Sequence, residues 1–90
     1  RSFKHKGLRQ LFTTGVSTGV NPKHVARLRK ITALLETAET LEDMSLPGLG
    51  LHQLKGSRQE TWAVNVSGNW RITFKIQKGD VFDVNYEDYH

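Results

Sequence analysis

Cysteine is absent from this chain of 90 residues. Its absence excludes disulfides and thiolate metal sites, and is typical of a protein of the reducing cytoplasm, which is the location we expect. Hydrophobic residues make up 37% of the chain, and only two prolines occur, so we expect a folded protein. No apolar run approaches the roughly 18 residues that span a bilayer. The length suits one hydrophobic core, so we expect residues 1–90 to form a single domain.

Acidic residues are missing from the first 35 positions, which hold eight basic ones. These are Arg1, Lys4, Lys6, Arg9, Lys23, Arg27, Arg29 and Lys30. A second basic block over 55–78 has five Lys and Arg against one Glu, and acidic stretches follow both blocks. This layout suits a polyanionic partner, because each cation that meets a phosphate releases a condensed counterion. Solvated helix faces explain the same pattern equally well.

Two helices are predicted in the first half of the chain. The first covers 4–14, with Leu8, Leu11 and Phe12 at helical spacing and Gly15 as its stop. The second is the stretch "NPKHVARLRKITALLETAETLEDM", for which Asn21 is a good N-cap. Its apolar stripe consists of Val25, Leu28, Ile31, Thr32, Leu35 and Ala38, and its basic residues Lys23, Arg27 and Lys30 lie opposite.

The second half of the chain alternates with period two and predicts an antiparallel meander. The inward residues that we expect are Trp62, Val64, Val66, Trp70, Ile72, Phe74, Ile76, Phe82, Val84 and Tyr86. Turns are predicted at Ser67-Gly68-Asn69 and Lys78-Gly79-Asp80. Helices followed by strands indicate an α+β domain with the helices on one face of the sheet. The other face would carry Ala63, Asn65, Arg71, Thr73 and Lys75.

Four histidines occur, far apart and without the spacing of metal ligands, so we expect no metal site. His5 and His24 fall on the polar sides of the helices and are predicted to be surface residues. His52, Lys55, Arg58 and Arg71, together with the tail Asp88-Tyr89-His90, form the remaining set. Taken singly, each member has an ordinary structural explanation. Taken together, they resemble the groups needed to cut RNA without a metal.

In such cleavage the ribose 2′-OH attacks its own phosphate. A base near neutrality must take the hydroxyl proton and an acid must protonate the leaving 5′-oxygen, and histidine suits both steps. Arg and Lys suit the charge that develops on the phosphorane. An aromatic ring such as that of Tyr89 can stack on a splayed base.

The stretch "LHQLKGSRQETWAVNVSGNWRITFKIQKGDVFDVNYEDYH" and the opening "SFKHKGLRQLF" resemble the HigB toxins of bacterial toxin–antitoxin systems, within the RelE/ParE superfamily. The resemblance covers nearly the whole chain and implies a compact RelE-like domain, with two N-terminal helices on a curved antiparallel sheet. It implies a first strand around residues 1–3. The one departure is Gln53, where the family commonly has proline, and we do not expect it to disable the site.

The resemblance also implies a ribosome-dependent endoribonuclease that cuts mRNA in the decoding site and arrests translation. The family's active-site pattern falls on His52, Lys55, Arg71, Asp88, Tyr89 and His90. His52 and His90 would share proton transfer, in an order that the sequence leaves open, and Asp88 would orient an imidazole. Arg71 and Lys55 would hold the phosphate. The implied contacts to ribosomal RNA are Lys4, Lys6, Arg9, Lys23, Arg27, Arg29 and Lys30, with Arg58 beside them.

The implied partners are a HigA-like helix-turn-helix antitoxin, the ribosome with its mRNA, and no membrane or cofactor. Two other functions fit the same small basic fold: a non-catalytic module that binds RNA or protein, and a ParE-like toxin that inhibits DNA gyrase. The gyrase toxins lack the His-rich set, so the terminal triplet favours RNA.

Overall fold

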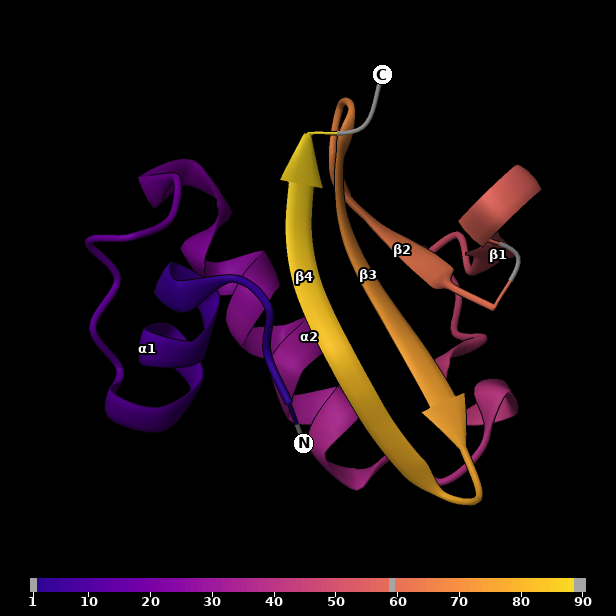
Figure 1. Ribbon diagram of the computed structural model, residues 1–90. Helices are drawn as coiled ribbons and strands as arrows, with labels where there is room; N and C mark the ends of the chain where they lie inside the picture. Colours follow the sequence, from indigo (N-terminus) through magenta and orange to yellow (C-terminus); the bar gives the residue numbers. More distant parts are fainter. Residues whose placement is uncertain (1, 59, 89–90) are drawn as a thin grey trace.

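Helices cover one face of an antiparallel sheet (Figure 1). The structure is a computed structural model that describes residues 2–58 and 60–88. The elements in chain order are α1 (Lys6–Thr14), η1 (Pro22–His24), α2 (Val25–Thr37), η2 (Leu41–Met44), β1 (His52–Gln53), η3 (Gly56–Arg58), β2 (Trp62–Ser67), β3 (Trp70–Gln77) and β4 (Asp80–Asp88). The strands lie side by side in the order β1-β2-β3-β4. The predicted α+β architecture is therefore confirmed.

The predicted helices form, with changes at their ends. His5 caps α1, since its Nδ1 accepts a hydrogen bond from the Leu8 N–H at 3.0 Å. Gly15 ends α1 with a φ of 77°, in the left-handed region that glycine adopts readily. Asn21 caps as predicted, but a 3₁₀ turn precedes the regular helix α2.

The second predicted helix is shorter than its apolar pattern. It ends at Thr37, and 41–44 form a separate 3₁₀ turn. The Asp43 carboxylate accepts hydrogen bonds from the N–H groups of Glu39 and Thr40, at 2.9 and 3.1 Å. These bonds stabilise a new helical start, so one continuous helix to Met44 was a wrong prediction.

A bulge changes which residues of β4 face the core. Thr73 pairs with Asn85 but Lys75 pairs with Phe82, so two residues of β4 oppose one of β3, and Asp83 has a φ of 53°. Val81 and Val84 are both fully buried, whereas Phe82 lies opposite Lys75 on the other face and is half-buried. The prediction that Phe82 points inward was wrong, because alternation breaks at a bulge.

The N-terminal segment runs parallel to β4 without forming a strand. A single bridge joins Phe3 to Val84, supported by hydrogen bonds from Lys4 N–H to the Val84 carbonyl and from Val84 N–H to the Ser2 carbonyl. The strand that the family resemblance implied at residues 1–3 is thus reduced to one bridge in the described part, which begins at residue 2. This contact still holds Lys4 beside the sheet.

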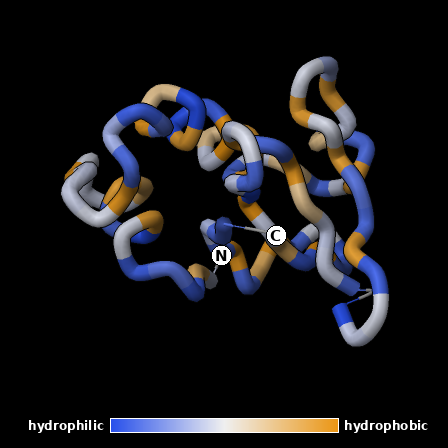
Figure 2. Tube along the Cα trace, turned by 90° about the horizontal axis from the view of Figure 1, so that it is seen from above, coloured by the Kyte–Doolittle hydropathy of each residue, from blue (hydrophilic) through white to orange (hydrophobic). Residues whose placement is uncertain are grey.

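The core lies between the helices and the sheet. Seen from above in Figure 2, the helical half lies on one side and the strands on the other. The fully buried side chains of the core include Leu8, Leu28, Ile31, Val64, Ile72 and Phe74. His24 also belongs to this interior, with 6% of its surface exposed and its Nδ1 2.5 Å from the Tyr86 hydroxyl. The prediction of surface histidines was therefore wrong for His24, while His5 is half-buried.

Candidate functional site

The outer face of the sheet, opposite the helices, gathers polar side chains in two rows. Cross-strand pairing places His52, Ala63, Thr73 and Asn85 in one row across the four strands, and Asn65, Arg71 and Glu87 in a second row two residues further on. Residues directly opposite each other point to the same face of a sheet, as do residues two apart along a strand. Both rows therefore share one face. His52 and Arg71 lie on strands separated only by β2, with Cα atoms about 12 Å apart from standard strand spacings.

Arg71 is fixed along the β2–β3 hairpin. One terminal nitrogen donates to the carbonyls of Gly68 and Trp70, at 2.6 and 3.0 Å. Its Nε is buried and has no hydrogen-bond partner within residues 2–58 and 60–88. A buried N–H donor without a partner is uncommon and costs free energy, so it needs an explanation. Because this N–H is buried, the guanidinium must shift along the hairpin before it can donate to an anion.

Glu87 lies directly across from Arg71 on β4 and holds Arg58 over the sheet. The two terminal nitrogens of Arg58 donate to the two carboxylate oxygens at 3.0 and 2.6 Å, and the Thr73 hydroxyl also donates to the carboxylate. The hydrogen bonds from Arg58 are the main reason that the pKa of Glu87 is lowered. Thr73 is buried beneath this pair although it points away from the helices. The sequence reasoning did not single out Glu87; its alternation with the inward Tyr86 was the available signal.

His52 lies on β1 with its imidazole exposed. Its Nδ1 is 2.8 Å from the Gly50 carbonyl, which accepts a hydrogen bond from Nδ1–H. In the neutral ring this bond leaves the lone pair on Nε2. The arrangement therefore presents Nε2 as a proton acceptor. Lys55 is exposed two residues after β1, in the loop that leads to η3.

Asp88 ends β4 on the opposite face from Arg71. It pairs with Trp70 across the strands. Burial raises the pKa of Tyr86, and the nearby charge of Asp88 raises it further by a smaller amount. Asp88 is therefore at the sheet edge beside the helix-facing aromatic residues, not beside His52. Tyr89 and His90, the other two members of the predicted tail, lie outside the described residues. The structure thus brings His52 and Arg71 to one face and separates Asp88 from both.

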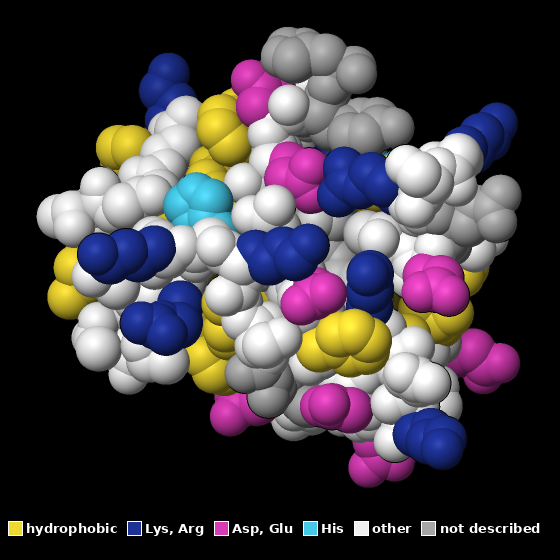
Figure 3. All heavy atoms as spheres, in the orientation of Figure 1, with side chains coloured by type: hydrophobic (Ala, Val, Ile, Leu, Met, Phe, Trp, Pro, Cys, Tyr) yellow, Lys and Arg dark blue, Asp and Glu magenta, His cyan; other side chains and the backbone are white. Residues whose placement is uncertain are grey.

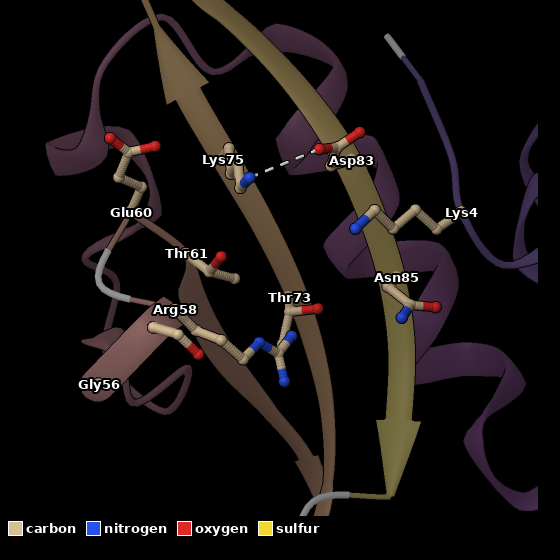
Figure 4. A pocket seen from close by; sticks show the side chains of 10 residues that line it. Lys4, Gly56, Arg58, Glu60, Thr61, Thr73, Lys75, Asp83 and Asn85 are labelled. Carbon is tan, nitrogen blue, oxygen red and sulfur yellow. Dashed lines mark ion pairs between the residues drawn. The ribbon is translucent and has the colours of Figure 1, made fainter.

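A cleft of about 360 Å³ opens on the outer face next to these rows (Figure 4). It is lined by Lys4, Gly56, Ser57, Arg58, Glu60, Thr61, Thr73, Lys75, Asp83 and Asn85. Lys4, Arg58 and Lys75 come from three different segments of the chain and reach toward the same space. Their convergence could not be read from sequence, because Lys4 lies in the first basic block, while Arg58 and Lys75 lie 17 positions apart in the second.

Comparison with known proteins identifies the family of the chain. The family model described as the RelE-like toxin of the type II toxin–antitoxin system HigB matches residues 1–90. The chain belongs to the HigB-like toxin family. It is 43% identical to the protein named endoribonuclease HigB of Proteus vulgaris over 90 residues, which cover 100% of this chain and 98% of that relative. The resemblance stated from the sequence motifs is thereby confirmed.

The cations of this HigB-like toxin differ in how far they are available. Among those predicted to contact RNA, Lys4, Lys6, Arg9, Lys23, Arg29 and Lys30 are exposed. Arg27 instead donates to the backbone carbonyls of Gly48 and Asn65, at 2.6 and 3.0 Å, and so ties α2 to β2 and to the preceding loop. On the face drawn in Figure 3, the area over α1 shows Lys and Arg side chains without acidic neighbours.

Metal ligands do not cluster in the part of the toxin that the structure describes. No group of three or more His, Asp or Glu side chains there is placed to hold an ion. In the same ranges, no helix is long and apolar enough to cross a membrane.

Proposed function

We propose that this HigB-like toxin is an endoribonuclease that cuts mRNA in the decoding site of the ribosome by acid–base catalysis on the outer face of the sheet. The observation that carries the proposal is the placement of His52 and Arg71 on one face, with a buried, unpartnered donor on Arg71 among the described residues. The family and the relative's name support an RNA-cutting toxin.

In the proposed reaction the 2′-oxygen attacks the adjacent phosphorus, and the bond from phosphorus to the 5′-oxygen breaks. Nε2 of His52 takes the proton of the 2′-OH, since the Gly50 carbonyl holds the ring with that lone pair free in its neutral form. His90 would protonate the leaving 5′-oxygen. Arg71 stabilises the charge on the phosphorane, assisted by Lys55. Tyr89 would stack on a base, and Asp88 would orient an imidazole.

Replacement of Arg71 and His52 tests the proposal. We expect Arg71→Ala and His52→Gln each to lower the single-turnover rate of mRNA cutting on ribosomes by about 100- to 10,000-fold. Primer extension on mRNA from programmed ribosomes measures the cut. Lys78→Gln, in the exposed turn between β3 and β4, removes one positive charge outside the site and serves as the control.

Three outcomes would contradict the proposal. Cutting of the same mRNA at an equal rate without ribosomes would remove the ribosome from the mechanism. Intact mRNA together with loss of DNA supercoiling would identify a gyrase inhibitor, and intact mRNA with tight RNA or protein binding would identify a non-catalytic module. The proposed antitoxin is a HigA-like helix-turn-helix protein, and its co-purification with the toxin from one operon would test that partner.

A further inference from the structure

The cleft on the outer face begins where the row of His52 ends. Thr73 and Asn85 belong to that row and also line the cleft, while Lys75 lies two residues further along β3, on the side away from Arg71. A ligand in the cleft would therefore continue directly from the reacting groups. The volume of the cleft, about 360 Å³, falls in the range of pockets that bind small organic groups.

Lys4 and Lys75 supply positive charge to this cleft in different ways. Lys4 is exposed, and its ammonium makes no ion pair or hydrogen bond with the rest of the described chain, although its charge helps to lower the pKa of Glu87 after the larger effect of Arg58. Lys75 is 3.7 Å from the Asp83 carboxylate, a long pair between partly exposed side chains. Such pairs are weak, so a phosphate can replace Asp83 at low cost.

Asn85 supplies a neutral donor at the same place. Its Oδ1 accepts a hydrogen bond from the Tyr86 N–H at 2.9 Å, which fixes the orientation of the amide. The NH₂ end is therefore the group that Asn85 offers to a ligand in the cleft. Arg58 contributes charge but is held in a bidentate pair with Glu87, so it shapes the wall.

We propose that this cleft is a second RNA subsite, which binds the phosphate of a nucleotide neighbouring the bond that is cut, through Lys4, Lys75 and the amide of Asn85. Two ammonium groups and an amide donor suit phosphate oxygens, whereas the Glu60 and Asp83 carboxylates of the same lining disfavour a phosphate placed beside them. The inference rests on the proposed function and adds a contact outside the reacting bond.

A cycle of protein and RNA changes tests the subsite. The mRNA carries a 2′-deoxyribose at the cut site, which removes the nucleophile, and one neutral methylphosphonate at each neighbouring position in turn. We expect one of these to weaken binding of the unmodified toxin to programmed ribosomes by about tenfold. The double variant Lys4→Gln/Lys75→Gln should bind the mRNA without a methylphosphonate more weakly by a similar factor. That methylphosphonate should then cause no further loss of affinity in the double variant.

The controls separate the subsite from other uses of the same cations. Lys78→Gln should keep the full sensitivity to the methylphosphonate. For the double variant, the salt slope of binding should fall by about 0.7 for each single-strand phosphate that the removed ammonium groups would have neutralised. Free inorganic phosphate at millimolar concentration should not displace the toxin, since the site is expected to bind the phosphate as part of the RNA chain.

Several results would overturn the subsite. The subsite would be refuted if each methylphosphonate weakened the binding of the double variant and of the unmodified toxin by the same factor. It would also be refuted if the double variant lost the same factor of affinity for ribosomes that carry no mRNA. Lys4→Gln alone repeats the test if the double variant unfolds. If the unmodified toxin fails to cut the all-ribose mRNA, the proposed function fails; if it cuts and the cycle is additive, only the subsite fails.

Discussion

Gly7 shows how a single missing side chain sets the packing of the helical half. A Cβ atom built on Gly7 would lie 2.3 Å from the carbonyl oxygen of Gly19, a backbone atom in the loop between α1 and η1. Backbone atoms held on both sides cannot shift without moving α1 away from this loop. The close contact therefore requires glycine at position 7.

We expect Gly7→Ala to destabilise the protein by about 1–3 kcal/mol through overpacking. Alanine is favoured over glycine inside a helix by about 1 kcal/mol, so the sign of the change separates a clash from helix propensity. Urea unfolding measures the difference. Thr13→Ala is the control, since it places alanine at an exposed position of the same helix. A stabilised Gly7→Ala protein would contradict the close contact.

At the residue scale, the sequence singled out His52 and Arg71 as candidates but not Glu87, which lies across from Arg71. The combination of residue types was informative, because imidazole and guanidinium groups together supply the proton transfer and the cation that RNA cleavage requires. The contact between Glu87 and Arg58 could not be predicted, because the two residues are 29 positions apart in the chain. The strand register that brings them together depends on two turns and a bulge. His24 was misassigned for the same reason, because its partner Tyr86 is 62 positions away.

At the scale of elements, helix α1 begins on a titratable cap. The His5 Nδ1 accepts the Leu8 N–H, which it can do only while that nitrogen is unprotonated. Burial lowers the pKa of His5 below its usual value. The unfolded chain therefore binds this proton more readily than the folded one, so stability begins to fall as the pH drops below about 6.5, and the cap is lost at the lower pH where the folded protein binds the proton.

We expect His5→Asn to remove this pH dependence. Asparagine caps helices through an oxygen that does not titrate, so the variant should lose less stability than the unmodified protein between about pH 7.5 and about pH 5. Urea midpoints at the two pH values measure the difference. His52→Asn is the matched control, because His52 is exposed and caps no helix, and it should keep the drop that His5 causes. Parallel pH profiles for the unmodified protein and His5→Asn would refute the role of the cap.

Element boundaries were predicted less well than element types. Periodicity identified both helices and the meander, because a core-facing stripe must follow the period of its element. It did not reveal the end of α2 at Thr37 or the bulge at Asp83. Both depend on backbone hydrogen bonds and a left-handed residue, which a pattern of apolar positions does not record.

At the scale of the whole molecule, the charge layout of the chain becomes a spatial one. Apart from Lys4, which lines the cleft, the exposed cations of the first half lie on the helical side, while Arg58 and Lys75 line the cleft on the outer face of the sheet. Arg27 is an exception, since its guanidinium joins α2 to the sheet. The order of helices and strands made this layout predictable, but not which cations the fold itself would use.

The helical cations lead to a prediction about the proposed binding to ribosomes. We expect Lys23→Gln/Lys30→Gln to weaken binding to ribosomes, and to lower the slope of log affinity against log salt by about 0.9 for each duplex RNA phosphate that these lysines neutralise. Arg27→Gln should instead lower the free energy of unfolding, because its three hydrogen bonds to backbone carbonyls are removed. Binding over a salt series and urea unfolding measure the two effects. If the lysine variant kept the full salt slope while its affinity fell, those side chains would not be meeting phosphates, and the basic helical face would be a solvated surface.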